Sequence, residues 1–157
     1  MRKALHPLLA KMALPLATLW VRRQERRILR RGRPLAARER DDARRAGVTE
    51  PEAVRVMVVR RVPVPSAGLL GLVARATGFP LFQPAGMALG RGIYLDEAAS
   101  RSRFILVHEL VHIAQYERLG GVPAFLRRYV AECLADGYES AALEREANEV
   151  SRRICEG

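Results

Sequence analysis

Residues 104–119 read FILVHELVHIAQYERL and decide how the rest of the chain is arranged. Two histidines, His108 and His112, stand four positions apart, and Glu109 directly follows the first. On a helix, positions i and i+4 lie on one face, so two imidazoles at this spacing can converge on one metal ion. Glu109 projects about 100° away around the helix, close enough to address a metal-bound water without being a ligand. The pattern therefore predicts a zinc site with a general base beside it.

The helix around this motif is predicted to be buried. Its apolar residues fill one side of the helical wheel and reach much of the rest, and a helix that is apolar nearly all round is a buried helix. A glutamate and two histidines inside it are costly unless something pairs with them. A metal site accounts for them better than the alternative, in which two core histidines adjoin a glutamate by chance.

The positive charge of the chain is concentrated at its N-terminal end. The net charge of +10 would by itself suggest a nucleic-acid-binding protein. Residues 1–61, however, contain 17 Lys and Arg against 6 Asp and Glu, whereas residues 62–157 contain 10 against 11. No aromatic residues interleave with the arginines of the connecting segment 30–53 to stack on bases, which argues against a nucleic-acid partner.

We predict two parts, a basic amphipathic helical segment over residues 1–50 and a metal-binding domain over residues 51–157. Apolar residues recur at helical spacing from Leu5 to Trp20, although Pro15 is expected to kink or break that helix. We expect the apolar stripe to pack on the rest of the protein. The alternative is contact of residues 1–30 with an anionic membrane surface, with Trp20 near the interface.

The N-terminus also resembles a secretory signal in outline, but Lys11 interrupts the apolar run and no clear cleavage site follows. The run is too short and too interrupted for a transmembrane helix. Cys133 and Cys155 lack a CxxC spacing, which favours reduced thiols. We therefore expect a cytoplasmic protein, with the inner face of the membrane as the alternative location.

The remaining pattern predicts an α+β fold, mainly helical, with a small antiparallel sheet next to the motif helix. Strands are expected at residues 54–62, 87–89 and 93–95, the last two forming a hairpin or one bulged strand. Helices are expected over residues 41–46, 69–77, 100–119, 123–136 and 141–154.

A catalytic zinc site needs a third protein ligand. His6 is remote in sequence, so the acids after the motif are better candidates. The inward stripe of the last helix is expected to consist of Leu143, Ala147, Val150 and Ile154. Glu146 lies on the flank of that stripe, about 40° from Val150, whereas Glu144 and Glu149 point further to the polar side.

Glu146 is therefore the acid with a sequence reason to point inward, and Glu132 and Glu139 are the reserves. The alternative for Glu146 is a surface carboxylate or an ion pair on its own helix.

The segments HELVHIAQ, residues 108–115, and LEREAN, residues 143–148, together resemble the gluzincin-type zinc metallopeptidases. More narrowly, they are similar to small bacterial HELxHxxQ proteins of unknown function with a later ExEA segment, over about residues 87–155. The resemblance implies a zincin-like fold, one Zn²⁺ per chain, and a peptide or protein substrate. It implies His108 and His112 as ligands, Glu109 as base and acid, and Glu146 as third ligand.

The resemblance also gives residues 92–95 a role, as an edge strand that holds an extended substrate by backbone pairing. The alternative is a purely structural strand. Tyr138 and Tyr116 are candidate hydrogen-bond donors to the developing oxyanion, or simply core or surface aromatics.

The sequence thus predicts a zinc-dependent hydrolase, specifically a small metallopeptidase with Glu109 as general base. Two alternatives stay open. One is a zinc-bound scaffold or regulatory domain without activity, and the other is a membrane-surface adaptor that acts through the basic N-terminal helix.

Overall fold

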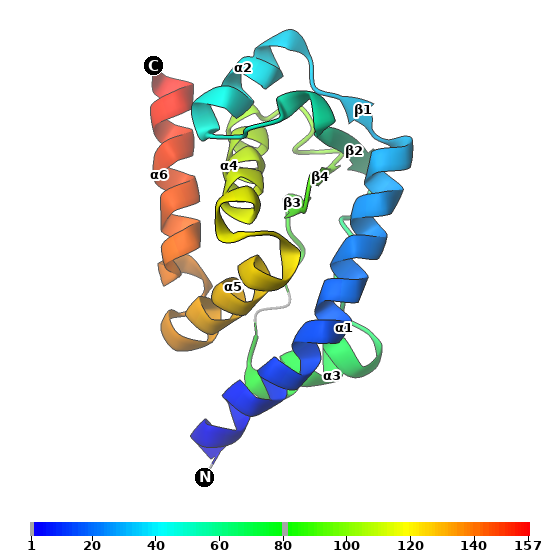
Figure 1. Ribbon diagram of the computed structural model, residues 1–157, viewed down its shortest axis with the longest axis vertical. Helices are drawn as coiled ribbons and strands as arrows, with labels where there is room; N and C mark the ends of the chain where they lie inside the picture. Colours follow the sequence, from blue (N-terminus) through cyan, green and yellow to red (C-terminus); the bar gives the residue numbers. More distant parts are fainter. Residues whose placement is uncertain (1, 80–81) are drawn as a thin grey trace.

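A small sheet separates the long N-terminal helix from the helix that carries the HExxH motif (Figure 1). The computed structural model describes residues 2–79 and 82–157, with side chains from residue 12 onward. The elements in chain order are α1 (Arg2–Arg31), β1 (Arg33–Pro34), α2 (Ala37–Ala46), β2 (Arg55–Val59), α3 (Gly68–Thr77), β3 (Gly86–Leu89), β4 (Gly92–Asp96), α4 (Arg103–Leu119), α5 (Val122–Asp136) and α6 (Ala142–Glu156). Short 3-10 helices occur at Pro51–Ala53 and Tyr138–Ser140. The fold is therefore α+β and mainly helical with a small sheet, as predicted.

The sheet is mixed, which corrects the expectation of an antiparallel one. Its strand order is β1-β2-β4-β3, with β4 parallel to β2 and antiparallel to β3. Of the two arrangements expected for residues 87–95, the structure has the hairpin, which consists of β3 and β4. The two strands are joined across Gly90, whose φ of 63° favours glycine. The chain passes through α3 between β2 and this hairpin, and such a crossover permits parallel pairing.

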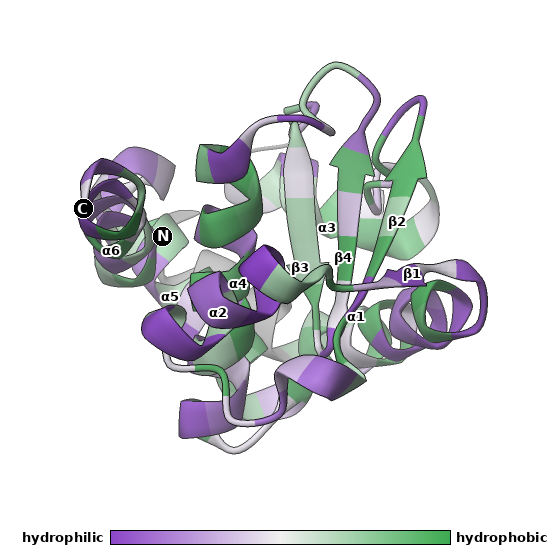
Figure 2. Ribbon diagram, turned by 90° about the horizontal axis from the view of Figure 1, so that it is seen from above, coloured by the Kyte–Doolittle hydropathy of each residue, from purple (hydrophilic) through white to green (hydrophobic). Residues whose placement is uncertain are grey.

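The expected edge strand is also corrected. Residues 92–95 belong to β4, which lies inside the sheet between β2 and β3. The strand at the edge beside α4 is β3, and the view from above shows it nearest that helix (Figure 2).

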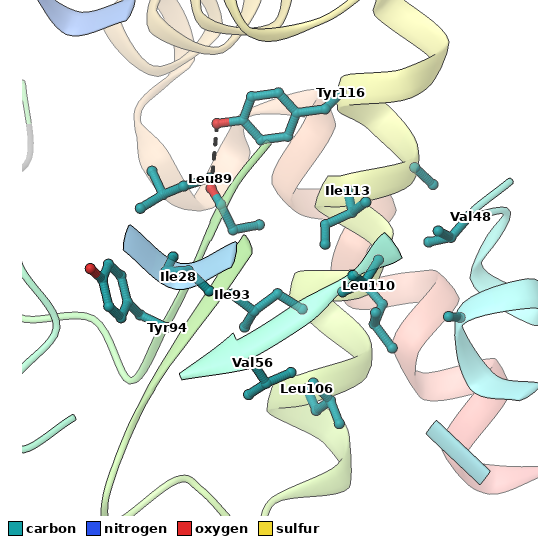
Figure 3. Close-up of a cluster of buried hydrophobic side chains, with 14 of the residues drawn as sticks. Ile28, Val48, Val56, Leu89, Ile93, Tyr94, Leu106, Leu110, Ile113 and Tyr116 are labelled. Atoms are coloured by element: carbon teal, nitrogen blue, oxygen red, sulfur yellow. Dashed lines mark hydrogen bonds between the residues drawn. The ribbon is translucent and has the colours of Figure 1, made fainter. Parts of the chain in front are cut away.

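Helices cover the sheet on both faces. Successive side chains of β4 point in opposite directions, so alternate residues of this strand are buried against each of the two helix layers. Ile93 is fully buried with the α4 residues Leu110 and Ile113 (Figure 3). Tyr94 points the other way, and its hydroxyl donates to Gln24 Oε1 of α1 at 3.0 Å. The sheet thus positions α4 against one face and α1 against the other.

The close approach of α1 to the sheet depends on a glycine. A Cβ at Gly92 would lie 2.8–3.1 Å from side-chain atoms of Ile28, which is fully buried. Ile28 therefore fills the space that a side chain on β4 would otherwise take.

Helix α1 is continuous from Arg2 to Arg31, so the expected break at Pro15 does not occur. Packing against α3, α5 and the sheet stabilises the helix and offsets the backbone hydrogen bond that Pro15 cannot donate. The expected inward packing of the apolar stripe is wrong for Met12, Leu16 and Leu19, which are exposed. The buried apolar residues of α1 are instead Val21 and Ile28, which lie beyond that stripe. His6 and the first part of the leucine stripe fall in the segment whose side chains lie outside the described residues.

No helix in the described part of the chain combines the length and the apolar character needed to cross a bilayer.

The first fifty residues pack against the rest of the chain. Strand β1 pairs with β2, and α2 contacts both α4 and α6. The buried carboxylate of Asp42 on α2 accepts two hydrogen bonds from Arg103, at 2.9 and 2.8 Å. Arg103 also donates to the carbonyl of Ile154 at 3.2 Å, so one guanidinium joins α2, α4 and α6.

The anchoring of α1 can be tested by shortening Ile28. We expect Ile28→Ala to lower the free energy of unfolding by about 3 kcal/mol, because the cavity faces a rigid strand. The neighbouring Leu29 is 39% exposed, so Leu29→Ala should cost less than about 1 kcal/mol. Denaturant unfolding followed by circular dichroism measures both. Equal losses would show that Ile28 does not anchor the helix.

Candidate metal centre

Helix α4 begins and ends at capping residues. The side chain of Ser102 accepts a hydrogen bond from the Ile105 backbone N–H at 3.3 Å, and Gly120 ends the helix with a left-handed φ of 95°. Every residue from 109 to 116 is buried. The expected buried helix is thus confirmed, and the polar groups on it need partners within the protein.

Three side chains converge at the middle of α4 and the start of α6. The Nε2 atoms of His108 and His112 lie 3.1 Å apart. His108 Nε2 lies 3.2 Å from Glu144 Oε2, and His112 Nε2 lies 3.3 Å from Glu144 Oε1. These three residues form a group that could hold a metal ion.

The carboxylate in this group is Glu144, and the expectation of Glu146 is corrected by the geometry. Glu146 turns toward Arg118, which donates to both of its carboxylate oxygens at 2.8 Å. It also accepts a hydrogen bond from Gln115 at 3.0 Å. The ion pair of Glu146 was the alternative considered, although its partner lies on α4 and not on α6.

The helical wheel predicted for α6 favoured Glu146 over Glu144 because it placed the buried face of the helix incorrectly. Val150, an expected inward residue, is only half-buried, whereas Ser151 is fully buried. The buried face is therefore centred closer to Glu144, which lies two turns before Ser151. Burial of the Ser151 hydroxyl costs little free energy, because it donates a hydrogen bond to the Ala147 carbonyl at 2.6 Å. A small hydroxyl residue at this spacing is the signal that could have indicated Glu144.

Gln115 fixes the protonation of His112. Its amide nitrogen contacts the Leu143 carbonyl and Glu146 Oε2, each at 3.0 Å, and both atoms only accept hydrogen bonds. The amide oxygen therefore faces His112 Nδ1, at 2.8 Å, and Nδ1 carries the proton. In the neutral ring this leaves the lone pair on Nε2, which is the atom that faces His108 and Glu144.

The buried charges of the site shift one another's pKa values. Burial lowers the pKa of His112, but hydrogen bonding and charge from Glu144 and Glu109 outweigh it and raise the pKa to about 8. Burial raises the pKa of Glu144, but contacts with both histidines and Tyr129 outweigh it, so the carboxyl pKa lies well below its usual range. Glu144 is therefore the anion of the site.

Glu109 occupies a different environment on the same helix. Burial raises its pKa, although the two histidines and a backbone hydrogen bond with Ala88 act in the opposite direction. A Cβ at Gly86 would lie 2.8 Å from Glu109 Oε1 and 2.9 Å from its Cγ. Strand β3 thus receives the Glu109 side chain in a space that only glycine leaves open.

Three tyrosines surround the group, in different roles. Tyr129, which the sequence did not indicate, donates to Glu144 Oε1 at 2.7 Å. Tyr138 lines the same cleft and packs edge-on against Phe82, with ring centroids 4.7 Å apart. Tyr116 is buried in the core and donates to the Ala88 carbonyl at 3.3 Å (Figure 3). Tyr116 is therefore a structural residue, whereas Tyr138 remains a candidate donor.

The group lies in a cleft of about 240 Å³. Its walls come from α1, α3, β3 and α5, and its titratable residues are His108, Glu109, Tyr116, His112, Tyr129, Tyr138 and Glu144. Trp20 is among its lining residues, which places this side chain toward the protein and not at an outer interface. The cleft is thus apolar apart from the cluster described above.

Comparisons of the chain with known protein families, with curated proteins and with solved structures find no match.

The identity of the third ligand can be tested with two neighbouring glutamates. We expect Glu144→Gln to weaken metal binding by at least about 100-fold, because it removes the anionic donor of the group. Glu146→Gln makes the same chemical change two residues away and should weaken binding by less than about 10-fold. Competition with a chelating dye measures both affinities. The reverse order of effects would restore Glu146 as the ligand.

The positioning role of Gln115 makes a separate prediction. Gln115→Leu leaves His112 Nδ1 without its acceptor, so we expect metal affinity to fall by about 10- to 100-fold. Gln83→Leu is the control, because Gln83 donates to the Val62 carbonyl outside the site. Affinity is measured as above, beside the thermal stability of the metal-free protein. An unchanged affinity with reduced stability would show that Gln115 is only structural.

Proposed function

We propose that the chain is a zinc-dependent peptidase in which His108, His112 and Glu144 hold the metal and Glu109 is the general base. The observation that supports this most directly is the convergence of two imidazole nitrogens and one carboxylate in a cleft that Glu109 also lines. Three protein ligands with a further position open to the cleft are typical of catalytic zinc sites.

The spacing of the donor atoms supports zinc as the ion. Zinc binds histidine nitrogen and carboxylate oxygen at about 2.0–2.1 Å in tetrahedral sites, which implies about 3.3 Å between any two ligand atoms. The three separations between the histidines and Glu144 are 3.1, 3.2 and 3.3 Å. The donors therefore already stand at the separations that a zinc ion would require.

The electrostatics of the group supports a divalent cation as well. Glu144 Oε2 is buried and accepts no hydrogen bond from the described residues unless His108 Nε2, which faces it at 3.2 Å, carries a proton. A buried carboxylate oxygen with no partner costs free energy, and a cation bound at that oxygen would remove the cost. Because His112 Nδ1 holds a proton, the neutral ring has its lone pair on Nε2, which would bind the same cation once the second proton is displaced.

In the proposed reaction, bound Zn²⁺ supplies a Lewis acid that polarises the scissile carbonyl and lowers the pKa of water. Glu109 takes the proton of the attacking water on its carboxylate and delivers it to the leaving amine. Burial favours the first half of this cycle, because a raised pKa makes the Glu109 carboxylate a stronger base. Gly86 and Ala88 hold the side chain in place from β3.

Tyr138 is the tyrosine best placed to donate to the developing oxyanion. Its ring lines the cleft, whereas the Tyr129 hydroxyl already donates to Glu144. Burial, followed by the charges of Glu144 and Glu109, raises the pKa of Tyr138, so its hydroxyl keeps its proton.

The substrate proposed for this cleft is an extended peptide paired with the edge of β3. Ala88, in that strand, is already hydrogen-bonded to Glu109 and Tyr116. Pairing is therefore expected at Gly86, which lines the cleft at the other end of the strand. Because the walls are apolar, a charged substrate side chain would be left unpaired there, and apolar side chains should be preferred.

Peptidase activity can be tested with Glu109→Gln. We expect the zinc-loaded wild type to cleave members of a random peptide library, and the variant to be slower by about 10²- to 10⁴-fold, because it cannot accept a proton. Zinc content should stay equal, since Glu109 is not a ligand. Mass spectrometry of the products and elemental analysis measure the two quantities.

Glu149→Gln, at an exposed position of α6, is the matched control and should keep full activity. Equal rates in wild type and Glu109→Gln would rule out Glu109 as the base. A zinc-loaded wild type that cleaves no member of the library would favour the inactive, zinc-bound scaffold instead.

A further inference from the structure

The outward face of α1 carries one continuous stripe with two chemically different halves. The stripe consists of Met12, Leu16, Leu19, Arg23, Arg26 and Arg30. These positions follow one another at intervals of three or four residues, so they lie on one side of the helix. At 1.5 Å per residue the stripe is about 27 Å long.

The first half of the stripe is apolar although it faces solvent. Met12 is 69% exposed, Leu16 40% and Leu19 61%. Leu69 and Leu72 of α3, a helix that packs against α1, are each more than half exposed. Large apolar side chains that follow one another along an exposed helix face, as Met12, Leu16 and Leu19 do, usually mark a surface that binds a partner.

The second half is strongly basic. Arg22, Arg27 and Arg31 flank the three arginines of the stripe, and all six are exposed. None of the six forms an ion pair with another described residue. Five of them line a shared surface hollow, where an anionic group would meet several guanidinium donors at once.

We propose that this stripe docks the protein on an anionic lipid bilayer. A bilayer surface offers phosphate and carboxylate groups at the level of the arginines and acyl chains just beneath them, so it satisfies both halves. A nucleic acid would pair with the arginines but leave Met12, Leu16 and Leu19 exposed to water. Since the stripe is straight, α1 would lie flat on the surface of the bilayer and would not cross it.

Docking in this orientation brings the cleft close to the lipid. Ala13, Leu14 and Ala17, on the other side of α1, line the cleft that contains His108 and His112. Only the thickness of one helix, about 10 Å, separates that wall from the docked face. The docking itself requires neither the metal nor hydrolysis.

The test is sedimentation of the 157-residue chain with vesicles of phosphatidylcholine, alone or with about a third phosphatidylserine, at about 0.15 M salt. We expect binding to the anionic vesicles only. The triple variant Arg23→Gln, Arg26→Gln, Arg30→Gln should lose at least about ten-fold in affinity, because each basic residue at the surface contributes separately. Replacing Met12, Leu16 and Leu19 by Gln should cause a loss of at least the same order.

The control is the triple variant Arg127→Gln, Arg152→Gln, Arg153→Gln, which has the same net charge and changes exposed arginines on α5 and α6. It should bind as the wild type does, and circular dichroism establishes that every variant is folded. An equal loss of vesicle affinity in the control would show that binding depends on the total charge of the protein and not on the stripe. The proposal would be overturned if the wild type does not bind anionic vesicles. It would also be overturned if the wild type binds duplex DNA more tightly than vesicles and the replacement of Met12, Leu16 and Leu19 leaves DNA binding unchanged.

Discussion

Three donors with lone pairs, His108 Nε2, His112 Nε2 and the Glu144 carboxylate, lie within 3.3 Å of one another inside an otherwise apolar layer. Much of the surrounding structure serves to keep them there. Gln115 orients one imidazole and also ties α4 to α6 through the Leu143 carbonyl. Such an arrangement is costly without a bound cation, because buried polar groups must be paired. The packing of α4 against α6 therefore has to offset the cost of bringing these donors together.

The β3–β4 hairpin sets the distances on both sides of this layer, through one glycine on each face. Gly86 points to α4 and leaves room for Glu109, while Gly92 points to α1 and leaves room for Ile28. A side chain at either position would push a helix away from the sheet, since interiors are close-packed. The position of Glu109 relative to the metal group therefore depends on how closely the sheet approaches α4.

The sequence predicted those features that depend on local spacing. The burial of α4 followed from its all-round apolar pattern, and the pairing of His108 with His112 followed from the four-residue interval. Glu144 was missed because Ser151, a buried polar residue that satisfies its own hydroxyl, looks like a surface position in a hydropathy pattern. Tyr129 was missed because its contact with Glu144 joins two helices. The parallel pairing of β2 with β4 depends on the path of the chain through α3, and no residue in either strand encodes it.

Helix α1 shows why a proline is a weak predictor of where a helix ends in a packed protein. Pro15 removes one backbone donor, but burial of Val21 and Ile28 and contacts with α3 and α5 outweigh that loss. Among the described residues, the polar anchors of α1 lie near its C-terminal end, where Gln24 accepts from Tyr94 and Glu25 from the Arg91 backbone. The described α1 side chains that wall the cleft, from Ala13 to Val21, are apolar and hold this part of the helix by packing.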